Sequence, residues 1–388
     1  MGVTPCYRLI ANDNDITALI TERMASLQLS DESGTHADTL EVVLADHLPN
    51  APLKLPPMGA ELELALGYDG QLRPMGVFVC SEIQLSGWPA TMTLRAHAAP
   101  WEGTPKGKSD LQTQKTRSWP AGTTLGAMLS TMAAEHGMTW AISPSLTDVA
   151  LPHIDQTEES DINVLLRLAQ RYDAIAKPAG GRLIFAKRGE AKSVTGITMP
   201  RITLTPDEIA SWQMTYATRD SPGTVIAFYR LARRAELHQV SVGDGHPVYR
   251  IKQYLPDAAA AIAAARGELS RRARAETKLT LEMAGRAELS AEAVLTLNGW
   301  REGVNGDWLV TRVQHCLDKN GYRCSVEAER PNNHPDVAAA INTQVRDQVV
   351  RPSRTHHQKT EGPAIGSAFS DTSMRRFLIP PPPPRPAY

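Results

Sequence analysis

Alternation of apolar and polar positions dominates the first hundred residues. Residues 61–66 alternate strictly, and residues 39–44 show the same period of two, which is the pattern of a strand with one buried face. Two further short strands are expected at residues 77–80 and 91–96. Turn-forming residues separate the strands in three segments, Pro56–Gly59, Tyr68–Gly70 and Ser86–Pro89. Short strands at this spacing predict a barrel-like β domain over residues 1–100.

The hydrophobic period becomes helical in the next segment of the chain. Apolar residues recur at helical spacing over residues 125–136, with Thr123 or Thr124 as the N-cap and Gly137 as the stop. A second apolar helical face runs from residue 162 to residue 172, and a short strand follows a glycine turn. Residues 101–195 are therefore expected to form a small α/β domain.

Strands return in the third region, residues 196–330. Asp257 precedes a run of alanines, which predicts a capped helix over about residues 257–276. Asn320–Gly321 lies between two alternating segments and predicts a β-hairpin over residues 307–329. The third region is thus expected to be a second barrel-like β domain with an inserted helix. The predicted fold class is strand-rich α+β.

A proline-rich tail is expected over residues 331–388. Hydrophobic periodicity fades there, although residues 336–350 could form one more helix. The run of prolines near the end can adopt only extended polyproline II structure. The composition of the tail predicts disorder in isolation or docking on a neighbouring molecule.

Composition narrows the class of protein. The formal net charge is −1 and aromatic residues make up 5%, so neither general attraction to nucleic acid nor a broad stacking surface is indicated. There is no run of 18 apolar residues and no signal-peptide pattern at the start. Four cysteines in 388 residues do not make a disulfide scaffold. We expect synthesis in a reducing cytosol.

Two segments resemble catalytic or nucleotide-binding motifs. The segment Gly103–Ser109 resembles a phosphate loop, but three residues separate its glycines where that loop needs four. It is interpreted as an exposed loop. Glu158, Glu159 and Asp161 could imitate the paired carboxylates of a glycosidase. Their place just before a helix favours capping and interaction with the helix dipole.

The candidate residues for metal binding and for nucleic-acid binding also give only weak indications of these functions. Cys316 and Cys324 are eight residues apart, which is too far for the close cysteine pair of a structural zinc site. Whether these two cysteines face each other, and their disulfide state, stays open. The other residues weighed for such roles are His315 and His334 beside these cysteines, His356–His357, the calcium-loop-like Asp13 and Asp15, and the basic Arg266, Arg271, Arg272, Arg274 and Lys278.

Ordinary structural roles account for each of these sets. The aspartates lack the glycine and distal glutamate of a calcium loop, so a turn is favoured. The basic residues are interrupted by Glu268 and Glu276, so a solvated or subunit-facing helix is favoured. No catalytic, cofactor-binding or metal-binding residue is assigned, and we expect no cofactor and no enzymatic activity.

Short motifs in a fixed order resemble the phage late control gene D family. In the first hundred residues they are Asp15–Thr17, Arg23–Leu27, Ala37–Val42, Pro56–Gly59, Leu64–Tyr68 and Met75–Phe78. Further along they are Ile154–Asp161 and Leu165–Ala169. Each motif alone is short, but their order and spacing together are specific. The resemblance covers roughly residues 5–330.

This resemblance implies a baseplate hub of a contractile phage tail or tail-like particle. The family is similar in fold to the N-terminal part of type VI secretion spike proteins and to hubs of Mu-like phages. It implies two related barrel-like domains and a homotrimer, so that six similar faces meet a sixfold tail tube. The implied partners are the tube or its initiator protein, the spike, the tape measure protein and other baseplate proteins. The implied location is the virion baseplate, assembled in the host bacterial cytoplasm.

Three functions of different classes remain to be separated. A secretion spike protein continues into an OB-like domain and a β-helix, whereas this chain continues into its proline-rich segment, so the needle is expected to be a separate protein. The alternative to a structural hub is a tail-associated peptidoglycan hydrolase that uses the acidic residues 158–161. A DNA-binding assembly regulator would require salt-dependent retention on duplex DNA. The sequence leaves open whether the particle is a phage, a bacteriocin or another injection particle.

Overall fold

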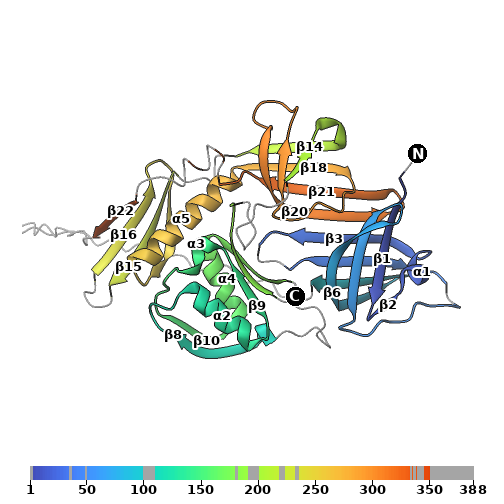
Figure 1. Ribbon diagram of the computed structural model, residues 1–388, viewed down its shortest axis with the longest axis horizontal. Helices are drawn as coiled ribbons and strands as arrows, with labels where there is room; N and C mark the ends of the chain where they lie inside the picture. The colour runs from blue at the N-terminus through green and yellow to red at the C-terminus, as the bar shows by residue number, and fades with distance from the viewer. Residues whose placement is uncertain are drawn as a thin grey trace, which may run out of the picture. The chain divides into compact units, whose positions relative to one another are not determined.

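The computed structural model of the chain is strand-rich α+β, as the sequence predicts (Figure 1). It divides into two compact units, residues 1–350 and residues 351–388, and everything described below belongs to the first. The structure describes residues 3–34, 37–48, 50–98, 110–179, 182–190, 201–217, 223–231, 236–332, 334, 338 and 345–349. The predicted domain boundaries near residues 100 and 195 fall outside these residues.

The largest sheet is built from two sets of strands that are far apart in the sequence. We call the first set the N-terminal half-sheet: β1 (Pro5–Ala11), β3 (Met24–Glu32), β4 (Thr39–Ala45), β5 (Glu61–Tyr68), β6 (Gln71–Ser86) and β7 (Thr91–Ala98). The short β2 (Asn14–Asp15) and α1 (Thr17–Ile20) connect β1 to β3. The strands expected from alternation in this region are all present.

The second set is the C-terminal half-sheet: β13 (Arg201–Leu204), β14 (Ile209–Tyr216), β18 (Thr277–Ala284), β19 (Val294–Leu297), β20 (Gly306–Asp318) and β21 (Gly321–Glu329). A 3-10 helix, η2 (Pro206–Glu208), connects β13 to β14. The expected hairpin at residues 307–329 is confirmed as β20 and β21. Antiparallel pairing of β3 with β20 joins the two half-sheets, and their buried apolar side chains share one hydrophobic core.

The two half-sheets have the same strand order. Along the hydrogen-bonded path the N-terminal half-sheet runs β1-β5-β6-β7-β4-β3, and the C-terminal one runs β13-β19-β20-β21-β18-β14. Numbered by position in the chain, both orders are first, fourth, fifth, sixth, third, second. One difference is direction, because β1 is antiparallel to β5 whereas β13 is parallel to β19. The chain therefore contains a topological repeat that its sequence does not display.

A smaller α/β part has its own core and lies between the half-sheets in the sequence. Its elements are η1 (Asp110–Gln112), β8 (Gln114–Trp119), α2 (Leu125–Glu135), β9 (Thr139–Ile142), α3 (Pro144–Thr147), β10 (Ile154–Ser160), α4 (Asp161–Tyr172), β11 (Ala174–Ala179) and β12 (Arg182–Lys187). The Thr124 hydroxyl caps α2 by accepting from the Ala127 N–H, as expected. Helix α4 ends at Asp173, which has the left-handed conformation.

A second insertion separates β14 from β18, and it is larger than the helix expected from the sequence. It contains β15 (Thr224–Leu231), β16 (Glu236–Gly243), β17 (Val248–Leu255) and α5 (Ala258–Ala275). The Asp257 carboxylate caps α5 by accepting from the Ala260 N–H at 2.8 Å, as predicted. Helix α5 buries its apolar side against this separate sheet.

One prediction for the C-terminal region is wrong. Residues 345–349, expected as helix within the tail, form strand β22 (Val345–Val349), which pairs antiparallel with β16. The edge of β16 offers backbone hydrogen bonds that a local pattern in residues 336–350 cannot reveal. The remainder of the proline-rich tail from residue 351 onward lies outside the described residues.

Candidate functional site

Asp161 is the centre of a buried polar network at the start of α4. Its carboxylate is fully buried and accepts from Arg117 Nη2 at 2.6 Å and from Lys115 Nζ at 2.9 Å. Gln156 Nε2 donates to it at 2.7 Å, and His136 Nε2 lies 2.8 Å from Oδ2. The network therefore ties strands β8 and β10 to helices α2 and α4.

The protonation state of this network is unsuited to glycoside hydrolysis. Burial raises the pKa of the Asp161 carboxyl, but hydrogen bonds from Gln156, Lys115 and His136 outweigh it and bring the pKa down to about 2. Burial acts in the same direction on Glu135, and its bonds to Lys115 and Arg117 again leave the pKa below its ordinary value. A glycosidase needs one carboxyl that stays protonated and reaches the substrate. Neither carboxyl meets that requirement.

The three acidic residues singled out in the sequence have separate roles. Ser160 is the N-cap of α4, and its hydroxyl accepts from the Asn163 N–H. Glu159 forms an ion pair with Arg167 at 2.8 Å, and Glu158 lies at the register shift in the β8–β10 pair. The helix-terminus interpretation is therefore right for the location, but the capping side chain is a serine and not a carboxylate.

Glu135, His136 and Asp161 also form a geometric candidate for a metal site. Their ligand atoms lie within 4.8 Å of one another. The same carboxylates already bind Lys115 and Arg117, so a divalent cation would have to displace two internal cations. We conclude that the cluster is a structural ion-pair network within the α/β part.

The histidine and cysteines of the β20–β21 hairpin separate into two groups. His315 Nδ1 lies 2.8 Å from the Tyr322 hydroxyl and 3.2 Å from the Cys324 sulfur, and all three side chains are buried. Cys316 is opposite Arg323 in the register, on the other face of the hairpin from Cys324. The four cysteines are free, which answers the disulfide question left by the sequence.

The His315 cluster is buried in the core. Burial lowers the pKa of His315 to about 4 and raises the pKa of Cys324 to about 11. Burial thus favours the uncharged forms of both side chains. His334, considered with these residues in the sequence, follows β21 and donates its backbone N–H to the Pro331 carbonyl.

Arg274 on α5 joins three parts of the first compact unit. Its guanidinium is fully buried and holds the Asp173 carboxylate with two bonds of 2.7 and 2.8 Å. It also donates to Glu329 of β21 at 2.9 Å and to Asn332 at 2.8 Å. Asp173 ends α4 of the α/β part. This single side chain therefore links the α/β part, the insertion and the C-terminal half-sheet.

The prediction of a solvated or subunit-facing basic helix is wrong for Arg274. Arg266 and Lys278 are exposed, and Arg271 and Arg272 pair with Glu268 on the same helix. A signal for the burial of Arg274 was present in the sequence. Ala260, Gly267 and Arg274 recur every seven residues on the buried side of α5, and such a spacing keeps residues on one helix face.

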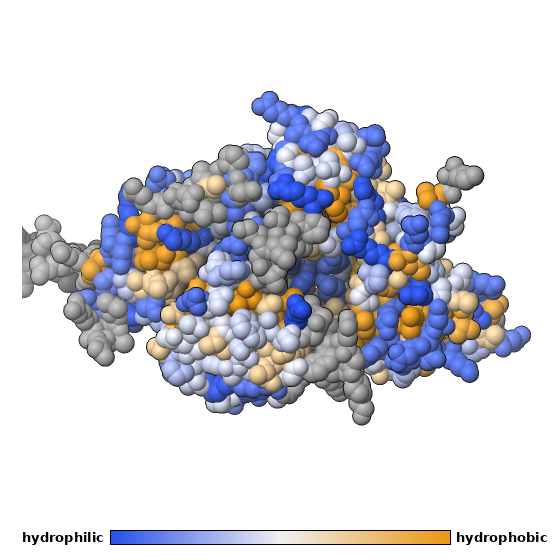
Figure 2. Space-filling model, viewed as in Figure 1, coloured by the Kyte–Doolittle hydropathy of each residue, from blue (hydrophilic) through white to orange (hydrophobic). Residues whose placement is uncertain are grey.

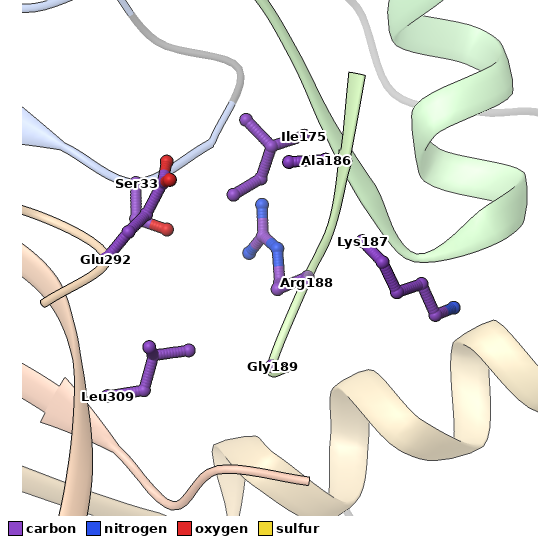
Figure 3. Close-up of a pocket in the computed structure, with 8 residues that line it drawn as sticks. All are labelled: Ser33, Ile175, Ala186, Lys187, Arg188, Gly189, Glu292 and Leu309. Carbon is purple, nitrogen blue, oxygen red and sulfur yellow. The ribbon is translucent and has the colours of Figure 1, made fainter. Parts of the chain in front are cut away.

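A small open pocket lies where the α/β part meets the large sheet (Figure 3). It is lined by Ser33, Ile175, Ala186, Lys187, Arg188, Gly189, Glu292 and Leu309. In Figure 3 the Arg188 guanidinium extends into the space, whereas the Lys187 side chain points away from it. Beside the pocket, Lys177 lies 3.6 Å from Glu292, and burial together with the charge of Asp38 raises the pKa of Asp31 to about 6.

The remaining residues considered in the sequence are the calcium-loop-like aspartates, the phosphate-loop-like segment and the histidine pair. Asp13 lies in the turn between β1 and β2, and Asp15 accepts from the Thr17 N–H at 2.9 Å, so the turn interpretation is confirmed. The phosphate-loop-like residues 103–109 and His356–His357 lie outside the described residues. In the described part of the chain, none of the helices is long and apolar enough to span a membrane. The polar clusters described above connect helices and strands through hydrogen bonds and ion pairs.

Comparison with known proteins gives a consistent result. The sequence model of the family described as "Phage tail baseplate hub (GPD)" matches residues 104–321, more than half of the chain. The chain is 29% identical over 373 residues to the probable baseplate hub protein of Escherichia phage 186, covering 84% of this chain and 93% of that protein.

Two solved structures are similar in fold. The 43 kDa tail protein of prophage MuSo2 from Shewanella oneidensis has a TM-score of 0.62 at 11% identity, covering 86% of this chain and 99% of that one. A component of the E. coli type VI secretion system has a TM-score of 0.50 at 11% identity, covering 81% of this chain and 74% of that one. These two likenesses concern the fold alone.

Proposed function

Because the chain belongs to the phage tail baseplate hub family, we propose that it acts as a homotrimeric adaptor between the sixfold tail tube and the threefold spike of a contractile tail. The strand-order repeat is the observation that carries this proposal. Three copies of a chain with two similar half-sheets present six similar units in a ring. Such a ring meets a sixfold partner on one side and a threefold partner on the other.

The role proposed is structural and not enzymatic. The buried clusters around Asp161 and Arg274 are held together by ion pairs between elements of the chain. Binding would therefore come from surface complementarity with the tube or its initiator, the spike, the tape measure protein and neighbouring baseplate proteins. Assembly in the host bacterial cytoplasm completes the proposal.

We further propose that the chain is divided into two barrel-like domains with a small α/β domain between them. The two half-sheets would serve as the two barrel-like units of residues 1–100 and 196–330, with the α/β part between them. The insertion that carries α5 would belong to the second of these units.

Light scattering after size-exclusion chromatography tests the assembly. The expected mass is three times that of the 42.3 kDa chain. Permanent interfaces of this kind bury roughly 2,000 Å² or more, so the trimer should stay intact during chromatography. Electron microscopy of the particle should place threefold density for the chain between tube and spike. A strictly monomeric chain at micromolar concentration, both alone and with its tail partners, would overturn the trimer.

A further inference from the structure

The topological repeat extends to the residue register of the strand pairs. Gly76 on β6 and Gly306 on β20 both have left-handed backbone, with φ of 125° and 106°. Two residues further on, Phe78 and Trp308 are both buried, at 2% and 0% exposure. They pair with Leu62 and Leu295 of the preceding strand in each half-sheet. β6 and β20 therefore correspond residue by residue, with a constant offset.

The register shifts between paired strands also lie at equivalent positions in the two half-sheets. The register of β6 against β7 shifts after Cys80, and that of β20 against β21 shifts after Val310. The register of β3 against β4 shifts after Met24, and that of β14 against β18 shifts after Ile209. Bulges are defined features of a sheet and fix the correspondence of its strands. β14 thus corresponds to β3 as β6 corresponds to β20.

Within one chain, β3 and β20 form the junction between the half-sheets. They pair antiparallel, with Leu29 opposite His315 and Ser30 opposite Gln314. Because β3 has β4 on one edge and β20 on the other, Leu27 and Leu29 are only 0% and 1% exposed. His315 is likewise fully buried. The junction therefore gives each of these two strands a hydrogen-bonded neighbour on this edge.

The corresponding strands at the other end of each half-sheet lack this neighbour. In the described part of the chain, β14 pairs only with β18, and Trp212, at the position of Leu27, is 44% exposed. The second half of β6 pairs with β7 on one edge and has an open second edge among the described residues. Leu85 there, at the position of His315, is 58% exposed. Among the residues that the structure describes, each half-sheet thus has one edge without its expected partner.

We propose that β14 of one copy pairs antiparallel with the second half of β6 in a second copy of the chain. The register of the β3–β20 junction then places Leu85 opposite Met214 and Ile83 opposite Tyr216. On the other face it places polar side chains together, Gln84 with Thr215 and Ser86 with Gln213. This apolar-to-apolar and polar-to-polar match on both faces was not used to set the register, and it supports the register independently.

The residue types on the β14 edge favour strand addition. β14 contains no charged residue and no proline along its eight residues, and such residues are the usual protection of an exposed edge. Figure 2 shows apolar residues reaching the surface in several separate patches, so exposure alone does not identify an interface. The repeat selects these two edges. A contact between different patches is heterologous, and it forms a closed ring when the rotation between copies is threefold, so this pairing rests on and deepens the proposed trimer.

Disulfide trapping tests the proposed register. Gln84→Cys and Thr215→Cys are combined in one full-length chain, with Cys6→Ser and Cys316→Ser to remove the partly exposed native thiols. Opposite residues in an antiparallel pair have Cβ atoms about 4.5–5.5 Å apart, close enough for a bond to form between copies. Mild oxidation is expected to give covalent dimers and trimers on a non-reducing gel, and no larger species.

Matched controls decide what a cross-link means. Each single cysteine variant should stay unlinked, because the contact joins different strands. The pair Gln84→Cys with Tyr216→Cys should also stay unlinked, because these residues point to opposite faces. Cross-linking of a single variant, or equal cross-linking of the wrong-face pair, would overturn the proposed pairing.

A second variant tests the contact without new cysteines. Leu85→Glu places an unpaired charge in the proposed interface and should convert the oligomer to monomer while the circular dichroism spectrum stays unchanged. Leu55→Glu is the control, because Leu55 is 60% exposed, like Leu85, and lies outside the two edges. If wild type is oligomeric but Leu85→Glu stays oligomeric and residues 84 and 215 do not cross-link, the inference fails and the trimer stands. If wild type itself is monomeric, the proposed trimer fails.

Discussion

Arg274 and Asp173 form a buried two-bond ion pair whose partners are 101 residues apart in the sequence. The side chains are 0% and 2% exposed. Glu329 adds a second carboxylate on the same guanidinium, at 2.9 Å. A buried charge is tolerated when it is paired and fully hydrogen-bonded, and it becomes costly when one partner is removed.

Replacement of Arg274 should therefore be among the most damaging single changes in the chain. Arg274→Met leaves two carboxylates buried without their cation, and the expected loss in the free energy of unfolding is about 3–5 kcal/mol. Urea denaturation measures it. Arg266→Met on the exposed side of α5 is the control and should change stability by less than about 0.5 kcal/mol. A loss below about 1 kcal/mol for Arg274→Met would contradict the role given to this residue.

Asp161 should make the protein sensitive to acid. Its pKa in the folded state is about 2, below its ordinary value of 3.8. The stabilisation is therefore complete above about pH 4 and is lost as the pH falls towards 2, with a magnitude of about 2 kcal/mol. Denaturation at several pH values should show this slope in wild type. In Asp161→Asn the slope should shrink, and an unchanged slope would exclude Asp161 as its source.

Asp31 should change the pH dependence of stability in the opposite direction to Asp161. Burial and the charge of Asp38 raise its pKa in the folded state from 3.8 to about 6. The folded state thus holds a proton that the unfolded state releases, so stability falls as the pH rises from about 4 to 6. Asp31→Asn removes this titration and should flatten the curve in that window. Asp13→Asn, in the exposed β1–β2 turn, is the control and should leave the slope as in wild type.

A cell-wall assay tests the absence of hydrolase chemistry. The purified chain should not clear a suspension of peptidoglycan faster than buffer, because Asp161 is buried against Lys115 and Arg117 and Glu159 is paired with Arg167. Glu158→Gln and Glu159→Gln should behave like wild type. Clearing by wild type that either variant abolishes would restore the catalytic interpretation of these residues.

Local signals in the sequence predicted the elements that depend on local interactions. The Asp257 cap, the alanine-rich helix and the Asn320–Gly321 hairpin were all found where expected. The β3–β20 junction could not be predicted, because its partners are nearly 300 residues apart and no local pattern pairs them. Strand β22 was missed for the same reason.

The site residues show a similar limit. A charged side chain such as Arg274 is assigned to the surface by any hydrophobicity pattern, although its spacing on α5 placed it on the buried face. The cations that surround Asp161 come from β8, a polar strand whose pairing with β10 is set by tertiary structure. Sequence patterns located the acidic residues, and only the fold supplied their partners.

The insertion that carries α5 bears on how this chain can diversify. It enters between β14 and β18, and the equivalent connection in the N-terminal half-sheet is the short segment between β3 and β4. A duplicated ancestor that gained a module at one of two equivalent loops would leave this asymmetry. The β3–β4 segment is thus a natural place to graft a foreign domain, since its counterpart already carries a helix and its own sheet without disturbing the ladder beneath.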